Sequence, residues 1–150
     1  MISKVMLDTN VVLDVLLARE PFADSSRQIF KLCEESKLQG VVTASCITDI
    51  YYIVRKHSKD ADLAYRVLGK LFDIVKVCDT TGADILSAYQ QKPKDFEDCV
   101  VATCALRVGC NCIITRNPTD FDASELPPIT PMEYIAARAK KQEEAEEAED

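Results

Sequence analysis

Short apolar runs alternate along the chain with longer segments in which apolar residues recur every three or four positions. The runs predict strands at residues 3–8, 41–45, 75–80 and 110–116, with another short strand near Ile129. The longer segments predict helices at residues 10–18, 24–40, 45–58, 60–74, 81–91 and 95–109, and a last helix within residues 126–141. Apolar strands that alternate with helices are typical of an α/β fold with a parallel sheet covered on both faces.

Polar residues and glycines mark the expected helix ends. Asp24 is a candidate N-cap for the helix at 24–40, and Gly40 is expected to end that helix. Gly109 is expected to close the helix that begins at Asp95. The pattern contains no internal repeat and no linker, and a length of 150 residues fits one domain.

Negative charge is concentrated at the C-terminus. Residues 140–150 hold six acidic residues and two lysines, within a net charge of −7 for the whole sequence. Such a run predicts a frayed or disordered acidic tail that follows a single domain at residues 1–139. The rest of the chain has no broad basic stripe of the kind that tight duplex-binding proteins carry.

The sequence lacks the features of a membrane or exported protein. No window approaches the roughly 18–20 apolar residues of a membrane span, and the start "MISKVMLDTNVVLD" does not have the pattern of a signal peptide. The seven cysteines are odd in number and form no CxxC, which favours buried thiols over disulfides or a zinc site. We therefore expect a cytoplasmic protein that does not contact a membrane.

Four aspartates are expected at one edge of the sheet: Asp8, Asp49, Asp98 and Asp120. Each of them follows a predicted strand or lies in the first turns of a predicted helix. In right-handed βαβ units these ends share one edge of the sheet, where open sheets place their binding crevice. Four carboxylates brought together repel one another, and a divalent cation removes that conflict. Oxygen ligands without histidine suit Mg²⁺ or Mn²⁺ rather than zinc.

Each acid also has a structural explanation. Asp8 could simply cap the helix that follows it. Asp95 and Asp98 have the spacing of a capping box, and we assign capping to Asp95 and the cation to Asp98. Asp49 could be a solvated helical residue, and Asp120 could be a turn residue.

Four stretches occur in order along residues 1–138: "VMLDTNVVLD", "ITDIYYIVRK", "DFEDCVVATCALRVGCNCIITRNPTDF" and "LPPITPMEYI". Together they resemble the PIN domain, and most closely the bacterial PIN proteins of the VapC type. The third stretch is the most specific, because an acid, a helix, a glycine, a strand and "TRNPTDF" follow one another in order. The resemblance implies a five-stranded parallel sheet between helices and a ribonuclease that depends on Mg²⁺ or Mn²⁺.

The resemblance also implies roles for single residues. Asp8, Asp49, Asp98 and Asp120 would be the catalytic acids, and Asp8 and Asp98 would hold the metal. The second acid is commonly Glu in this family, so Asp49 is one methylene shorter than the usual residue. The residues expected to support the site are Thr9, Asp95, Thr115 and Asn117.

Two basic residues lie near the predicted crevice. Arg116 and Lys94 are candidates for contacts with RNA phosphates, or they are ordinary surface charges. The resemblance further implies RNA as the substrate, an antitoxin protein as the inhibitor and a homodimer as the assembly. A second interpretation remains open, in which a weak or inactive PIN-fold module binds RNA or a protein partner. The short Asp49, and Asn117 where some PIN branches have Asp, favour that interpretation.

Overall fold

Five parallel strands form the sheet of this computed structural model, which describes residues 2–121 and 124–149. They are β1 (Lys4–Leu7), β2 (Gln39–Thr43), β3 (Lys76–Cys78), β4 (Cys112–Ile114) and β5 (Pro128–Ile129). Their order across the sheet is β3-β2-β1-β4-β5. The predicted five-stranded parallel sheet is therefore confirmed.

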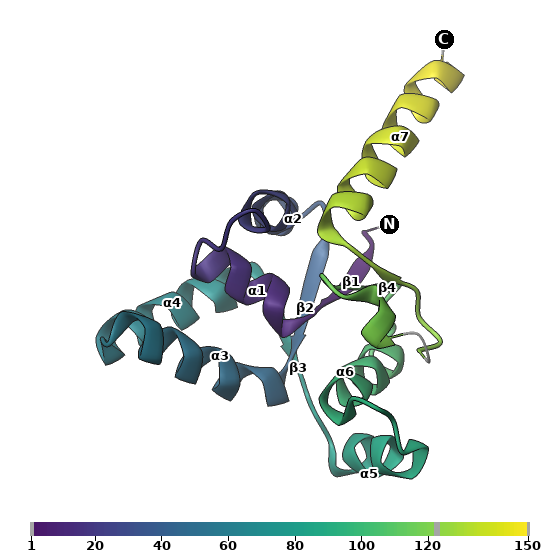
Figure 1. Ribbon diagram of the computed structural model, residues 1–150. Coiled ribbons are helices and arrows are strands. Elements are labelled where there is room, and N and C mark those ends of the chain that lie inside the picture. Colours follow the sequence, from purple (N-terminus) through teal and green to yellow (C-terminus); the bar gives the residue numbers. More distant parts are fainter. Residues whose placement is uncertain (1, 122–123, 150) are drawn as a thin grey trace.

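Seven α-helices and one 3-10 turn connect the strands within the described residues. They are α1 (Thr9–Leu16), α2 (Ala23–Glu34), α3 (Ala44–Ser58), α4 (Ala61–Ile74), α5 (Gly82–Gln91), α6 (Phe96–Arg107), η1 (Pro118–Phe121) and α7 (Pro131–Glu149). Figure 1 shows α1 to α4 on one side of the sheet and α5 and α6 on the other. This two-sided cover explains why the strands are apolar without alternation.

The chain changes direction across the sheet at β1. This strand pairs in parallel with β2 on one side and with β4 on the other, so that Met6 lies between Val41 and Ile113. The chain first builds outward from β1 to β2 and β3, and then returns past β1 to form β4 and β5. Open α/β sheets bind ligands at this switch point, outside the carboxyl ends of the strands. The residues that follow β1 and β4 therefore border the expected crevice.

The start of α2 differs from the prediction. The helix begins at Ala23 and ends at Glu34, so it is shorter than the predicted segment 24–40. Asp24 is not its N-cap, because Phe22 holds that position and Asp24 lies in the first turn. A carboxylate in the first turn still interacts favourably with the helix dipole, which explains why the residue type suggested a helix start.

Gly40 does not end α2, and this prediction was also wrong. It lies in β2, where a Cβ atom would meet the Cys33 Sγ at 2.9 Å and the Leu7 Cδ1 at 3.1 Å. The glycine is therefore required by close packing between the strand and its neighbours. Gly109 does close α6 as predicted, with a φ of +79° just beyond the helix end.

The last helix, α7, continues through the segment that was expected to be a tail. It runs to Glu149 without a break at residue 139, and Figure 1 shows it extending away from the body. Tyr134 and Ile135 pack against the core, whereas the side chains from Ala139 to Glu149 are exposed. The described part of residues 140–150 is helical, and Asp150 lies outside the described residues; the frayed or disordered tail stays a prediction. The domain boundary at residue 139 stays a prediction.

The remaining expectations from composition concern the membrane and the cysteines. Among the described residues, no helix is long and apolar enough to cross a membrane. All seven cysteines are free thiols, and six of them are buried. The preference for buried thiols over disulfides is therefore confirmed.

Candidate active site

A cleft of about 540 Å³ lies at the carboxyl ends of the central strands. Its lining combines six carboxylates with a few polar and apolar side chains. The lining residues are Asp8, Thr9, Asn10, Leu13, Asp49, Tyr52, Ile53, Asp95, Glu97, Asp98, Asn117 and Asp120. The structure therefore brings together the four acids that the sequence placed at one edge, although their catalytic roles stay a prediction.

Asp8 follows β1 directly and is 7% exposed. Its Oδ2 accepts a hydrogen bond of 2.9 Å from the Thr115 hydroxyl, whose oxygen accepts another of 3.1 Å from the Asn117 N–H. Burial raises the pKa of the Asp8 carboxyl, and the bond from Thr115 opposes that rise. Asp8 stands at the N-cap of α1, but its side chain makes no capping hydrogen bond. Capping therefore does not explain this carboxylate, and Thr115, which directly follows the neighbouring strand β4, orients it.

Asp95 and Asp98 lie at the start of α6 and have different functions there. Asp95 caps the helix, because its Oδ1 accepts a hydrogen bond of 2.9 Å from the Asp98 N–H. The Asp98 side chain points into the cleft lining. Burial, followed by the negative charges of Asp8 and Asp95, raises the pKa of the Asp98 carboxyl to about 7. A bound cation would favour its charged form.

The other walls of the cleft come from α1, α3 and η1. Asp49 is exposed on α3, and Asp120 is exposed on η1, where its N–H donates a 3.0 Å hydrogen bond to the Asn117 carbonyl. Thr9 lies in the first turn of α1, and its buried hydroxyl oxygen has no hydrogen-bond partner among residues 2–121 and 124–149. The predicted supporting residues thus surround the acids, and their contribution to function is still to be tested.

Sequence reasoning missed two prominent residues of the lining. Glu97 precedes Asp98 in α6 and was not predicted as a site residue, although adjacent helical residues differ in direction by only about 100° and can both border one cleft. Burial, followed by the charges of Asp49 and Asp95, raises the pKa of the Glu97 carboxyl. Tyr52 lies one turn after Asp49 on α3, and the spacing of i and i+3 could have indicated a shared face.

Lys94 lies beside the cleft, as the sequence suggested. It lines an adjoining pocket of about 610 Å³, together with Cys99, Phe121 and other residues. The two cavities share Asp95, Asp98 and Asp120. A phosphate bound near these three acids would therefore border the pocket that Lys94 lines.

Arg116, by contrast, is directed at Asp14 on α1. Its Nε lies 2.8 Å from the Asp14 Oδ2 in an ion pair that lacks an aligned N–H···O hydrogen bond. Its guanidinium also lies 4.2 Å from the centre of the Phe22 ring. Arg116 does not belong to the cleft lining. This position supports a structural role and gives no support to the predicted contact of Arg116 with RNA phosphates.

The chemistry of the lining suits a hard divalent cation. Its acids offer only oxygen atoms, and burial, followed by the negative charges of Asp8 and Asp95, raises the pKa of Asp98. In the part of the chain that the structure describes, no three acidic, histidine or cysteine side chains form a ready-made ligand set. Magnesium commonly binds one or two carboxylates and keeps water in its other positions. Asp8 and Asp98 therefore fit as the predicted pair.

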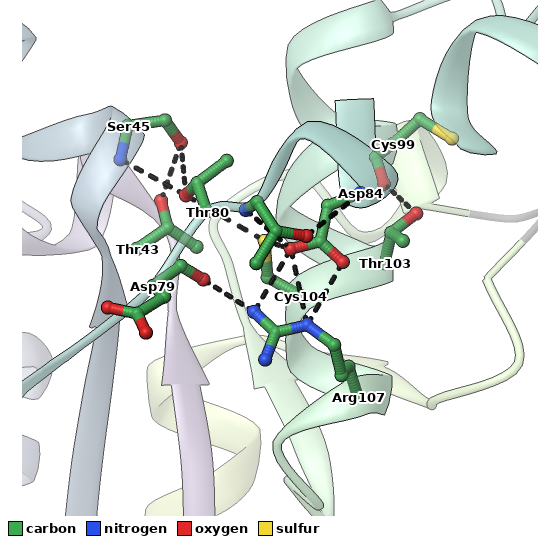
Figure 2. A network of polar contacts seen from close by, with 10 residues as sticks. Thr43, Ser45, Asp79, Thr80, Asp84, Cys99, Thr103, Cys104 and Arg107 are labelled. Atoms are coloured by element: carbon green, nitrogen blue, oxygen red, sulfur yellow. Dashed lines mark hydrogen bonds and ion pairs between the residues drawn. The ribbon is translucent and has the colours of Figure 1, made fainter. Parts of the chain in front are cut away.

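Another buried acid, Asp84, lies outside the cleft in a network of polar contacts (Figure 2). Thr81 and Asp84 form a complete capping box at the start of α5. The Arg107 Nε lies 3.0 Å from Oδ1 of Asp84, and its Nη2 lies 3.0 Å from Oδ2 and 2.6 Å from the Asp79 carbonyl. The Arg107 guanidinium beside it holds the pKa of Asp84 at about 2. This carboxylate is fully used in joining α5 to α6.

The chain matches one family model. The model is described as the PIN domain, and it matches residues 4–119. A curated relative, Ribonuclease VapC1 of Aquifex aeolicus (strain VF5), is 24% identical over 136 residues. The match covers 87% of this chain and 92% of the relative.

Two solved structures are also similar. One is Mycobacterium tuberculosis VapC20, described as a sarcin-ricin loop cleaving toxin, with a TM-score of 0.63 and 11% identity over 79% of this chain and 94% of that one. The other is a toxin-antitoxin complex from Klebsiella pneumoniae, with a TM-score of 0.60 and 20% identity over 85% and 97% of the two chains. At these identities the likeness establishes the fold.

Proposed function

The chain belongs to the PIN domain family, and we propose that it is an endoribonuclease that hydrolyses RNA phosphodiester bonds with Mg²⁺ or Mn²⁺. The observation that carries this proposal is the crowding of carboxylates at the switch point of the sheet, where the pKa of Asp98 rises to about 7. Strongly shifted acids in a cleft are typical of functional sites. The ribonuclease and the RNA-cleaving toxin among the similar proteins support the same activity.

The acids divide into two proposed roles. Asp8 and Asp98 hold the cation, and the Thr115 hydroxyl fixes the orientation of the Asp8 carboxylate through the 2.9 Å hydrogen bond. Asp49 and Asp120 lie at the rim of the same cleft and orient the attacking water or hold a second ion. Asp49 is shorter than the usual Glu, so its carboxylate would act on the ion either directly or through a water. Lys94 contacts a neighbouring phosphate of the RNA from the adjoining pocket.

The proposed reaction is a displacement by water at phosphorus. A divalent cation, when bound, polarises the phosphoryl group and lowers the pKa of water. The residues around the site hold the water and the phosphate in position, which converts an encounter in solution into a reaction within one complex. The water oxygen forms a bond to phosphorus, and the bond to the 3′ oxygen breaks. The products carry a 5′-phosphate and a 3′-hydroxyl.

We further propose that the protein is the toxin of a toxin-antitoxin pair. The similar complex from Klebsiella pneumoniae is such a pair, and the similar Mycobacterium tuberculosis protein is a toxin. An antitoxin protein would then inhibit the enzyme by binding it. The homodimer that the family resemblance implies stays a prediction.

The direct test is cleavage of a labelled RNA by the purified protein. Parent protein, Asp8→Asn and Asp62→Asn are compared with Mn²⁺ and again after removal of metal with EDTA. Asp62 is the matched control, because it lies in the first turn of α4 and outside the cleft lining. We expect cleavage by the parent and by Asp62→Asn that depends on metal, and a loss of more than about 100-fold in Asp8→Asn, beyond the usual effect of outer-shell partners. Full activity of Asp8→Asn would contradict the assignment.

A second function is a PIN-fold module that binds RNA or a protein without cleaving RNA. The short Asp49 favours it, as does Asn117, which stands where some PIN branches have Asp. In that case the parent protein would bind the labelled RNA and leave it intact in Mg²⁺ and Mn²⁺. The cleavage experiment therefore separates the two functions.

A further inference from the structure

An ion pair outside the cleft joins two of its walls. Asp14 lies on α1, one residue after Leu13 of the cleft lining, and its side chain is fully buried. Arg116 lies at the start of the loop that connects β4 to η1, and its side chain is 23% exposed. The distance from the Arg116 Nε to the Asp14 Oδ2 is 2.8 Å. The pair therefore connects the helix that follows Asp8 to the loop that carries Asp120.

The sheet and the core fix the two ends of this loop. The Thr115 N–H donates a 3.0 Å hydrogen bond to the Ile129 carbonyl of β5, and the Phe121 side chain is buried. Between these ends the Asp120 side chain is exposed. Arg116 attaches the same segment to α1 through its side chain. The position of Asp120 relative to α1 therefore depends on Arg116.

Stability alone does not account for this pair. In the described parts of the chain, neither side-chain oxygen of Asp14 accepts an aligned hydrogen bond, and the Arg19 Nη1 comes only within 3.8 Å of the Asp14 Oδ1. Buried charges recover the cost of leaving water only when their geometry and hydrogen bonds are good, and apolar side chains of similar volume are often at least as stabilising. The Arg116 guanidinium also lies 4.2 Å from the centre of the Phe22 ring, which restricts its movement further. The pair is therefore better suited to fixing the loop than to stabilising the fold.

We propose that Asp14 and Arg116 are positioning residues, whose ion pair holds the loop so that Asp120 keeps its place in the cleft lining. This inference rests on the proposed ribonuclease function, in which Asp120 orients the attacking water or holds a second ion. Asp8 has separate support from Thr115, which the sheet holds. The pair therefore acts on Asp120 and not on the acids that are proposed to hold the first ion. A displacement of about 1 Å in a positioning group can lower a rate by roughly 100-fold.

A double substitution separates positioning from stability. Asp14→Leu combined with Arg116→Met replaces the ion pair with apolar side chains that resemble the branched shape of Asp and the unbranched stem of Arg, so the fold should be retained. Arg116→Met alone leaves the buried Asp14 carboxylate without its nearest cation and should melt well below the parent. The matched control is Asp24→Leu combined with Arg27→Met, which removes an exposed pair on α2, outside the cleft lining, whose charged atoms lie 3.9 Å apart.

The measurements cover stability, metal binding, catalysis and loop mobility. For the parent and each variant we would record the melting temperature, the dissociation constant of Mn²⁺ by calorimetry, and kcat and KM for cleavage of a labelled RNA. Backbone hydrogen exchange of residues 115–121 is followed by mass spectrometry, with residues 39–43 of β2 as the internal reference.

We expect the double variant to melt near the parent and to bind Mn²⁺ as tightly. Its kcat should fall by about 10- to 100-fold, the usual effect of partners that orient a functional group. KM should change little, because Asp120 is proposed to act on the attacking water or a second ion rather than on RNA binding. Residues 115–121 should exchange faster than in the parent, because a freed loop opens bonds such as the 3.1 Å hydrogen bond from the Asn117 N–H to the Thr115 hydroxyl. The control variant should match the parent in every measurement.

A double variant with parent-like kcat and parent-like exchange would overturn the inference, because the pair would then not position the loop. Loss of Mn²⁺ binding in that variant would also overturn it, since the pair would then act on the acids that hold the first ion. A folded parent that cleaves no RNA would overturn the proposed function instead. The exchange of residues 115–121 would in that case still decide whether the ion pair holds the loop.

Discussion

Asp84 and Asp98 occupy the same position in two neighbouring helices, yet their carboxyl groups have opposite properties. Each is the third residue of its helix, Asp84 in α5 and Asp98 in α6. Hydrogen bonds from Arg107 hold the pKa of Asp84 at about 2. Burial, followed by the charges of Asp8 and Asp95, raises the pKa of Asp98 to about 7. The aspartate at the third helix position therefore stabilises the fold in α5, whereas in α6 it lines the candidate active site.

The difference comes from the neighbours rather than from the aspartates themselves. Asp84 has a neutral N-cap, Thr81, and a guanidinium that reaches both of its oxygens. Asp98 has a charged N-cap, Asp95, and faces further carboxylates across the cleft. A carboxylate surrounded by donors stabilises the folded state, whereas a carboxylate surrounded by other acids stores a repulsion that a cation can relieve. The folding free energy should therefore respond oppositely to substitution at the two sites.

The largest expected effect is the loss of stability in Asp84→Asn. The substitution removes the charge that pairs with Arg107 and weakens the capping box; since the Arg107 side chain is 40% exposed and solvent screens the pair, we expect a cost of about 2 kcal/mol. Urea unfolding measures it. Asp79→Asn is the matched control, since Arg107 uses only the carbonyl of that residue. If Asp84→Asn lost no more unfolding free energy than Asp79→Asn, the network would not stabilise the fold.

Arg107→Lys should have a smaller effect of the same sign. Lysine keeps the charge but loses the two-pronged contact with Asp84 and the 2.6 Å bond to the Asp79 carbonyl, so we expect a smaller loss of stability than for Asp84→Asn. The same urea experiment measures it. A lysine variant as stable as the parent would show that charge alone, and not the geometry in Figure 2, holds α5 against α6.

Asp98→Asn should raise stability, and the gain should depend on pH. The folded-state pKa of about 7 lies above the ordinary value of 3.8, so ionisation of Asp98 costs stability as the pH rises from about 4 to 7. Without metal we expect a gain on the order of 1 kcal/mol at pH 8, after solvent screening, and almost none at pH 4. Asp84→Asn should lose stability at both values, because its pKa of about 2 lies below them. Melting temperatures measured across this pH range test both expectations. The account would be contradicted if Asp98→Asn and Asp84→Asn both melted above the parent, or both below it, at pH 8.

The smallest effect is expected at Asp95, where the two roles are combined. Asp95→Ser keeps an acceptor for the Asp98 N–H and removes one negative charge from the cleft, so stability should change by less than about 0.5 kcal/mol. Asp95→Ala loses the cap and should be less stable than the serine variant by about 1 kcal/mol. Equal stability of the two variants would mean that capping by Asp95 contributes nothing.

The hydrophobic pattern was sufficient for the fold, because strand and helix periods are local properties of the sequence. The parallel topology then placed Asp8, Asp49, Asp98 and Asp120 at one edge without any knowledge of contacts. Local sequence signals gave wrong predictions where packing between residues distant in the sequence determines the structure. Gly40 was predicted to be a helix end, but it pairs with Val5 as part of β2, and the nearness of the Cys33 Sγ requires a glycine there.

Contacts between distant side chains could not be predicted from the sequence. The pairs Asp84–Arg107 and Asp14–Arg116 depend on how neighbouring helices and loops pack, and no spacing rule connects their members. Arg116 was therefore left as either a phosphate contact or an ordinary surface charge, and Asp84 was not singled out at all. Tyr52 joins the cleft because α3 turns that face toward the acids, which a periodicity cannot establish without the position of α6.

The central claim is that the repulsion around Asp98 exists to bind a divalent cation, and a titration with Mn²⁺ tests it most directly. Parent, Asp84→Asn and Asp98→Asn are freed of metal with EDTA, dialysed and melted at pH 8 with increasing Mn²⁺. A ligand that binds only the folded state stabilises it, by about 2.7 kcal/mol at 100 times its dissociation constant. The account predicts a rise in melting temperature for the parent, an equal rise from a lower start for Asp84→Asn, and almost no rise for Asp98→Asn. An equal rise in Asp98→Asn, or no rise in the parent, would contradict it.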